Sequence, residues 1–246
     1  TTGAYNTALG RSAGTAVTTG VRNTIIGGLS GDALTDADDN VVLGYLALSN
    51  DTLGSRTIAI GKGALTTQNF TSATDTYNTA MGYNAGNQVT TGVQNTLIGG
   101  LAGDALTGGG FSGTTRQDGA DFNTAVGYDA LHTDTLGSRS VAIGRRSLYT
   151  QNFTSATDSY NTAVGFNSGY AVTTGVQNTF VGGLAGDGTD DGDSNTAVGY
   201  LALSANAGDN NCAFGINALL SCTGDANAAF GNNASLNVSS GSNNIG

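Results

Sequence analysis

Polar and apolar residues follow a five-residue pattern that recurs along the whole chain. The pattern is Asn, Thr, an apolar residue that is often Ala, a large apolar residue and Gly, as at residues 6–10, 95–99 and 161–165. Most closing glycines stand 16 or 17 residues apart, and the exceptions are two steps of 21 and one of 28. A fixed short period over a whole chain predicts a repeat architecture.

Each repeat predicts one coil of an all-β, parallel β-solenoid with about 17 residues per coil. Gly92, three residues before a motif Asn, is typical of a tight turn in which Gly adopts a positive φ. Residues 96–98 predict a short strand, Gly99 a bend, and Leu101 a second short strand. Stacked coils would pair through parallel ladders and bring the motif asparagines into one hydrogen-bonded column.

The alternation within each strand predicts which side chains face the interior. We place Thr7, Leu9 and their equivalents inside the coil, and the residue between them outside. An exposed column of mostly small apolar residues favours close packing against other chains, so we interpret it as a trimer interface. The alternative is a second packed layer within one chain. The column comprises Ala8, Ile25, Val42, Ala59, Ala80, Leu97, Ala125, Ala142, Ala163, Phe180, Ala197, Ala213 and Ala229.

Composition agrees with a fold of strands and turns. The 246 residues include 40 Gly but no Pro, no Trp and no Glu, whereas Asn, Thr, Gly, Asp and Val are abundant. The net charge of −10 argues against nucleic acid, because phosphate binding needs clustered Lys and Arg. No apolar run is long enough for a membrane span, so we expect no membrane insertion. The chain begins and ends inside a repeat, and we interpret residues 1–246 as one continuous segment of a longer solenoid.

Two stretches resemble the head repeat of trimeric autotransporter adhesins, the YadA-like β-roll. Residues 140–147 read Ser-Val-Ala-Ile-Gly-Arg-Arg-Ser, and residues 57–64 read Thr-Ile-Ala-Ile-Gly-Lys-Gly-Ala. The resemblance implies a left-handed parallel β-roll in which three chains form one shaft. The wording Asn-Thr-Ala-Val-Gly-Tyr-Leu-Ala-Leu at 195–203 also looks like fibre proteins of tailed phages, cyanophages especially.

These features predict a structural protein of a phage fibre, a rigid trimeric shaft that belongs to the virion. Its expected partners are two further copies, other fibre or virion proteins, and a host-surface glycan. The alternative is the head domain of a bacterial trimeric autotransporter adhesin on the cell surface. We expect no enzymatic activity and no cofactor, because no carboxylate pair suggests glycoside cleavage.

Three insertions, near 66–76, 107–121 and 149–159, are the candidate receptor-binding loops. Insertions in a solenoid emerge on one face, which is often the binding face. Phe70, Phe153 and Phe111 could stack on a sugar, or each could fold back and close its own loop. The candidate contact residues are Gln68, Asn69, Phe70, Phe111, Arg116, Gln151, Asn152 and Phe153.

The residue after the closing Gly offers a second aromatic feature. It alternates between an aromatic residue and Gly or a basic residue. Such a stripe could bind glycan or simply pack against the bend. The aromatic members are Tyr45, Tyr83, Tyr128, Phe166 and Tyr200.

Other chemistry is sparse. Asp187, Asp191 and Asp193 form a candidate calcium site without the EF-hand spacing, and the alternative is a solvated turn. Cys212 and Cys222 could form a disulfide or remain two buried thiols.

Overall fold

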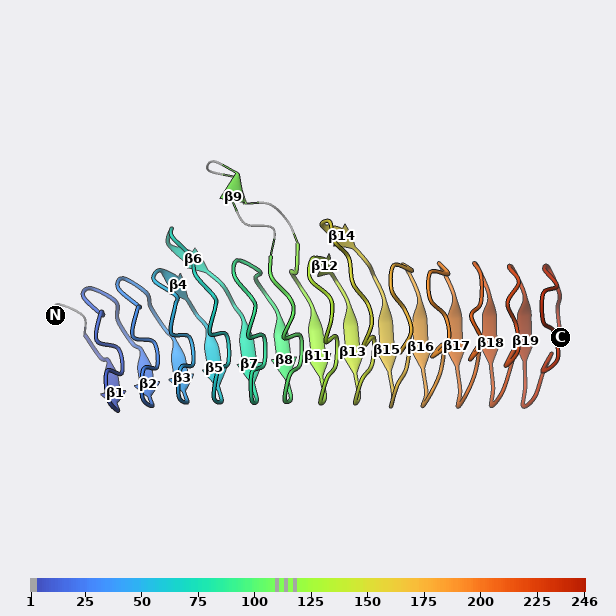
Figure 1. The fold of residues 1–246 in the computed structure, drawn as a ribbon, viewed down its shortest axis with the longest axis horizontal. Coiled ribbons are helices and arrows are strands. Elements are labelled where there is room, and N and C mark those ends of the chain that lie inside the picture. Colours follow the sequence, from blue (N-terminus) through green and yellow to red (C-terminus); the bar gives the residue numbers. More distant parts are fainter. Residues whose placement is uncertain (1–3, 109–110, 113–114, 117–118) are drawn as a thin grey trace. The chain divides into compact units, whose positions relative to one another are not determined.

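The computed structural model describes residues 4–108, 111–112, 115–116 and 119–246, with 111–112 and 115–116 described through their backbone alone. The chain divides into two compact units, residues 1–125 and 126–246. Each unit is a stack of coils joined by parallel β-pairing (Figure 1). The described residues contain strands and turns but no helix. The predicted all-β parallel solenoid is therefore confirmed.

Each coil contributes one three-residue strand at the positions that follow the motif Asn. In the first unit the order is β1 (Thr7–Leu9), β2 (Thr24–Ile26), β3 (Val41–Leu43), β5 (Ile58–Ile60), β7 (Thr79–Met81) and β8 (Thr96–Ile98). In the second unit it is β13 (Val141–Ile143), β15 (Thr162–Val164), β16 (Thr179–Val181), β17 (Thr196–Val198), β18 (Cys212–Phe214) and β19 (Ala228–Phe230). β11 (Thr124–Val126) lies where the two units meet in the sequence.

Neighbouring strands pair without any shift in register. Thr79 pairs with Thr96 and Ala80 with Leu97, so each position of the repeat stacks on the same position of the next coil. In the second unit Ala163 pairs with Phe180 in the same way. In-register stacking turns every repeat position into a column of similar side chains.

The predicted second strand of each coil is wrong. After the strand β8, Gly99 forms the predicted bend and residues 100–105 form consecutive turns, in which Leu101 has a φ of 58°. A left-handed residue breaks the extended geometry that a strand requires. Bonding between coils nevertheless continues through these turns, because the N–H of Leu101 donates to the carbonyl of Tyr83 at 2.9 Å.

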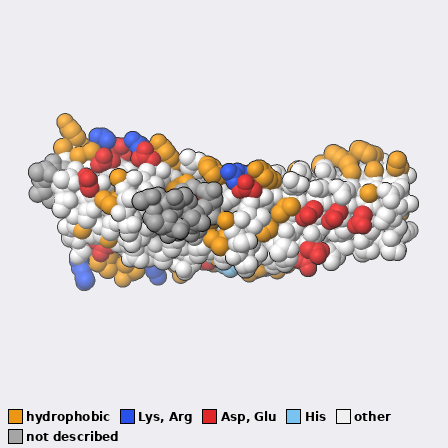
Figure 2. Space-filling model, turned by 90° about the horizontal axis from the view of Figure 1, so that it is seen from above, with side chains coloured by type: hydrophobic (Ala, Val, Ile, Leu, Met, Phe, Trp, Pro, Cys, Tyr) orange, Lys and Arg blue, Asp and Glu red, His pale blue; other side chains and the backbone are white. Residues whose placement is uncertain are grey.

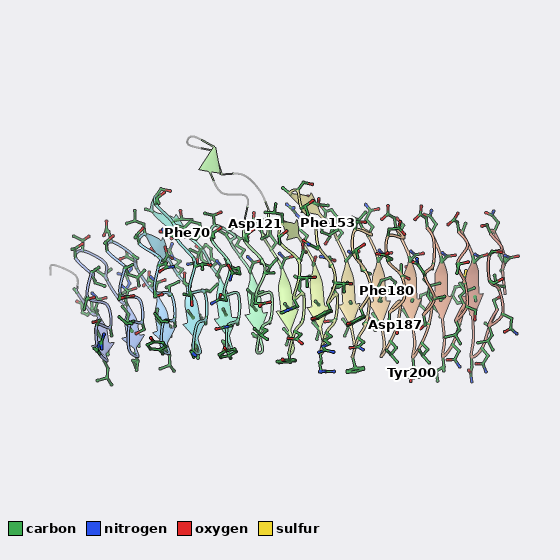
Figure 3. The ribbon with its side chains drawn as sticks, in the orientation of Figure 1. Phe70, Asp121, Phe153, Phe180, Asp187 and Tyr200 are labelled. Atoms are coloured by element: carbon green, nitrogen blue, oxygen red, sulfur yellow. The ribbon has the colours of Figure 1, made fainter. Side chains whose placement is uncertain are left out.

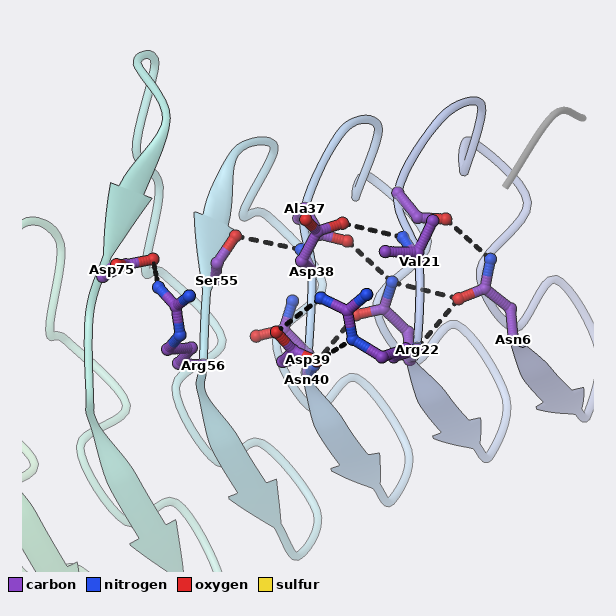
Figure 4. Close-up of polar contacts among 12 residues, drawn as sticks. Asn6, Val21, Arg22, Ala37, Asp38, Asp39, Asn40, Ser55, Arg56 and Asp75 are labelled. Atoms are coloured by element: carbon purple, nitrogen blue, oxygen red, sulfur yellow. Dashed lines mark hydrogen bonds and ion pairs between the residues drawn. The ribbon is translucent and has the colours of Figure 1, made fainter. Parts of the chain in front are cut away.

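The motif asparagines form the predicted ladder (Figure 4). The backbone N–H of Asn23 donates to Oδ1 of Asn6 at 2.8 Å, while Nδ2 of Asn6 donates to the carbonyl of Gly20 at 2.7 Å. In the second unit the N–H of Asn178 donates to Oδ1 of Asn161 at 2.8 Å. Each buried amide thus pairs with backbone groups of its own coil and of the next coil. These bonds prevent the destabilisation that unpaired buried polar groups would cause.

The glycine three residues before the motif Asn has a different role from the one predicted. Gly20 is not among the glycines with positive φ; instead Arg22, directly before Asn23, has a φ of 59°. A Cβ on Gly20 would lie 2.4 Å from the carbonyl oxygen of Ala37 in the next coil. Close approach of the coils therefore requires Gly here.

The predicted trimer-interface column lies inside the coil. Its members are Ala8, Ile25, Val42, Ala59, Ala80, Leu97, Ala125, Ala142, Ala163, Phe180, Ala197, Ala213 and Ala229, and all except Ala8 in the first coil are buried. The residues on either side, such as Thr24 and Met81, face outward instead. These buried side chains cannot contact another chain, so their assignment to a trimer interface is wrong.

Packing inside the coil explains why the column is mostly Ala. The fourth residue after the closing Gly also points inward, and in several coils it is a buried left-handed Leu, such as Leu203 with a φ of 54°. A small Ala197 in the strand leaves room for it. Where the strand residue is large, Gly replaces Leu: Cβ atoms built on Gly169 and Gly186 would lie 3.0 and 2.4 Å from the ring of Phe180.

Size complementarity predicts the effect of truncating Phe180. Phe180→Ala should lower the free energy of unfolding by about 3–5 kcal/mol, because the buried ring leaves a cavity. Adding Gly186→Leu recreates the Ala197 and Leu203 pair of the next coil, so it should recover part of the loss, although a left-handed Leu costs about 1–2 kcal/mol. Chemical denaturation measures both variants. A double variant no more stable than Phe180→Ala would contradict this packing rule.

Candidate binding and association surfaces

The two shorter insertions fold back onto their coils. Residues around them form small parallel sheets, β4 (Gly54–Ser55) with β6 (Thr74–Asp75) and β12 (Gly137–Ser138) with β14 (Thr157–Asp158). Figure 3 marks Phe70 and Phe153 at the base of these insertions. Phe70 is fully buried and Phe153 is 6% exposed. Neither ring is available to stack on a sugar, so each closes its own loop.

A buried carboxylate anchors each insertion. Asp51 accepts hydrogen bonds from the N–H of Phe70 at 3.0 Å, the N–H of Gly54 at 3.1 Å and Nε2 of Gln68 at 2.6 Å. Nδ2 of Asn78, a member of the Asn ladder, donates in turn to Oε1 of Gln68 at 2.9 Å. These bonds connect the insertion directly to the ladder.

The second insertion reproduces this cluster 83 residues later. Asp134 accepts from Nε2 of Gln151 at 2.6 Å and from the N–H of Phe153 at 3.1 Å. Nδ2 of Asn161 donates to Oε1 of Gln151 at 2.8 Å. The same polar network is therefore built twice from the same residue types.

The cluster also fills a gap in the Asn ladder. Thr57 takes the place of the motif Asn in its coil, and its hydroxyl lies 2.7 Å from the hydroxyl of Thr76. In the second copy Ser140 takes this place and pairs with Ser159 at 2.6 Å. A coil that carries an insertion therefore exchanges one amide for a group of short polar side chains.

Asp51 and Asp134 stand six residues before the motif Asn position, in a core column that also holds the aliphatic Leu34 and Val172 and the buried Thr189. Burial raises the pKa of both carboxyls above their usual value, because desolvation disfavours the charged form. The hydrogen bonds from Gln68 and Gln151 oppose this shift but do not cancel it.

The candidate binding residues therefore separate into three groups. Gln68, Gln151, Phe70 and Phe153 are buried, and their prediction as sugar contacts is wrong because they anchor the loops. Asn69 is exposed and Asn152 half-buried, and each accepts a hydrogen bond from a threonine of the preceding coil. The side chains of Phe111 and Arg116 lie outside the described residues; their backbones form the antiparallel pair β9 (Phe111–Ser112) and β10 (Thr115–Arg116).

Two of the three candidate calcium residues bond to neighbouring coils instead. Oδ1 of Asp193 accepts the N–H of Val176 at 2.7 Å, and Asp187 accepts the hydroxyl of Ser204. Asp191 is exposed. No group of three or more His, Cys, Asp or Glu among the described residues could hold a metal ion.

The two cysteines are free thiols. Cys222 is buried beside the Asn ladder, where Nδ2 of Asn227 donates to its sulfur at 3.2 Å, and burial raises the pKa of its thiol. Cys212 is half-buried on the outward side of β18, not at the inward position that the sequence predicted.

The outward side of the strands carries an exposed apolar column. Figure 2 shows that apolar side chains reach the surface in several groups on the face in view. The third residue of many strands is large and apolar, and Phe214 and Phe230 stack with ring centroids 5.2 Å apart. Its exposed members are Leu9, Leu43, Met81, Ile98, Ile143, Val181, Phe214 and Phe230. We call this set the outer column. The sequence pattern predicted two columns correctly but exchanged their sides.

Comparison with known proteins adds no family. No family model matches the chain, and no significant match was found to a curated protein or to a solved structure. Among the described residues, no helix has the length and apolar character needed to cross a membrane.

The buried carboxyls predict an unusual pH response. Their folded pKa lies above the usual 3.8, so their contribution to stability is full below that value and is lost as the pH rises through the folded pKa. Relative to the double variant Asp51→Asn, Asp134→Asn, the unmodified chain should therefore gain stability as the pH falls from about 7 towards about 4. Thermal unfolding midpoints across this range measure the difference.

Other carboxylates cancel in this comparison because both proteins share them. Asp39, for instance, has its pKa lowered by its hydrogen bond with Arg22 in both. A difference in midpoint that stays constant or shrinks in acid would show that Asp51 and Asp134 do not titrate as described.

Proposed function

We propose that the chain is a structural segment of a fibre shaft, of the kind found in tailed phages, and that its copies associate side by side as a trimer. The observation that carries the proposal is in-register stacking: every described coil hydrogen-bonds to its neighbours through the strand ladder and the residues beside it. Such a chain gains length by adding coils, each of which contacts only the next. The YadA-like resemblance of residues 57–64 and 140–147 supports the trimer.

The outer column is the surface best suited to lateral association. Its exposed fractions run from 36% at Phe214 to 67% at Leu9, and the highest values belong to the first and last strands, β1 and β19. Exposed large apolar side chains that recur on successive coils are typical of an interaction site. The column repeats once per coil, so association along it would gain area with every added coil.

Lateral association can be tested on the isolated chain. Light scattering coupled to size exclusion should give the mass of a trimer. Ile143→Asp and Ile98→Asp together place charges on the outer column, where burial against another chain would be costly, and should convert the trimer to smaller species. The control Ser72→Asp, Ser155→Asp adds the same charge on the exposed insertions and should leave the mass unchanged.

Circular dichroism distinguishes loss of assembly from loss of fold in these variants. A stable monomer for the unmodified chain would contradict the proposed trimer, even if the solenoid itself is intact.

The biological context needs a separate test. Antibodies raised against the chain should label fibres on phage particles by immunogold electron microscopy. Labelling of bacterial cell surfaces without any phage would instead support the adhesin-head alternative.

A further inference from the structure

Two sets of exposed residues repeat an aromatic–cation–aromatic order in three successive coils. Tyr45, Lys62 and Tyr83 form the first set, which we call triad 1. Tyr128, Arg145 and Phe166 form triad 2, in the other unit and 83 residues later in the sequence. Each member directly follows a closing Gly, so in-register stacking places the three side chains of a triad in one column.

The two triads share one cation–ring distance. Nζ of Lys62 lies 5.6 Å from the ring centroid of Tyr83, and Cζ of Arg145 lies 5.6 Å from that of Phe166. The four aromatic side chains are each about half exposed, between 49% and 53%. Lys becomes Arg and Tyr becomes Phe between the copies, which preserves the charge and the aromatic ring but not the phenolic hydroxyl.

Among the described residues, the cations of the triads form no ion pair with an acidic side chain. Elsewhere in the chain Arg22, Arg56, Arg139 and Arg146 each form an ion pair with an aspartate. Among the described residues, none of these ion pairs includes Lys62 or Arg145, and both side chains are exposed. No residue after a closing Gly is acidic in any coil, although the chain carries a net charge of −10. The column therefore offers isolated positive charge on an otherwise acidic protein.

This combination selects a particular class of ligand. Exposed aromatic rings can hold the apolar face of a sugar ring, and a cation without a partner can bind a carboxylate through charge-assisted hydrogen bonds. Three coils place the outer rings about 10 Å apart along the stack, which suits an extended chain more than a single small molecule. One cation per triad is too few for the phosphates of a nucleic acid.

We infer that each triad is a binding site for a linear, carboxylate-bearing polysaccharide, with the cation on the carboxylate and the rings against sugar faces. This site is additional to the structural role proposed above, since a shaft that binds no glycan would keep its fold and assembly.

The chain supplies a matched control for this site. Arg56 lies over Tyr77 at 5.7 Å and Arg139 over Tyr160 at 5.9 Å, so these pairs have the same cation–aromatic geometry. Their arginines, however, are neutralised by Asp75 and Asp158. If cation–aromatic contact alone mattered, both kinds of pair would bind equally.

The experiment measures binding of polygalacturonate oligosaccharides to the full 246-residue chain by calorimetry. Lys62→Gln with Arg145→Gln should weaken binding roughly tenfold, as expected for a lost charge-assisted hydrogen bond. Tyr83→Ala with Phe166→Ala should weaken it similarly, whereas Arg56→Gln with Arg139→Gln should not. The fully methyl-esterified oligosaccharide, which keeps the sugar backbone but lacks the charge, should bind as weakly as the Gln variant does.

Several results would overturn the inference. They are absence of binding by the unmodified chain, equal binding of the ester, and equal loss in the Arg56 and Arg139 control. A change in oligomeric mass in the Lys62 and Arg145 variant would also overturn it, because the column would then be a contact between copies of the chain. Thermal unfolding of each variant confirms that the fold is retained.

Discussion

The rest of the structure depends on one constraint, which is that each repeat position stacks on the same position of the next coil without a shift in register. Each motif Asn accepts a hydrogen bond from a backbone N–H of the next coil and donates one to a backbone carbonyl. Its side chain therefore pairs a buried backbone donor and a buried backbone acceptor. Because an unpaired buried amide is costly, the column of motif asparagines tolerates few substitutions. Where Thr57 and Ser140 interrupt it, a hydroxyl, a glutamine and a buried aspartate restore the lost bonds.

The same stacking determines composition. Backbone N–H groups donate to the neighbouring coil in the strands and also in the turns, as Leu101 does to Tyr83. Proline lacks this donor and cannot adopt the left-handed conformation found at Arg22, Leu101 and Leu203. The absence of proline from all 246 residues agrees with these two demands. The abundant glycines have a similar cause: a Cβ on Gly20 would meet the next coil's backbone.

Much of the fold, but less of its surface, could be predicted from the sequence. The period predicted the solenoid and the spacing of the asparagines predicted the ladder, because the solenoid and the ladder both follow from geometry that every coil repeats. Alternation showed that Ala80 and Met81 face opposite sides of the strand. It does not show which of the two sides is buried, and the interior was assigned to the wrong one. The inverse sizes of Phe180 and Gly186, compared with Ala197 and Leu203, carried the missing information.

The pairing of large residues with glycines also has a consequence for recombination. Phe180 occupies space that belongs to two coils, since glycines of its own coil and of the preceding one make room for it. A crossover between Gly169 and Phe180 would bring Phe180 against a leucine inherited from another coil. Exchange is free of this conflict only between coils that both carry Ala in the strand and Leu in the turn, such as those of Ala197 and Ala213. Recombination within such a gene should therefore join segments between coils of this Ala and Leu type. Each inherited segment should keep a bulky strand residue together with the two glycines that make room for it.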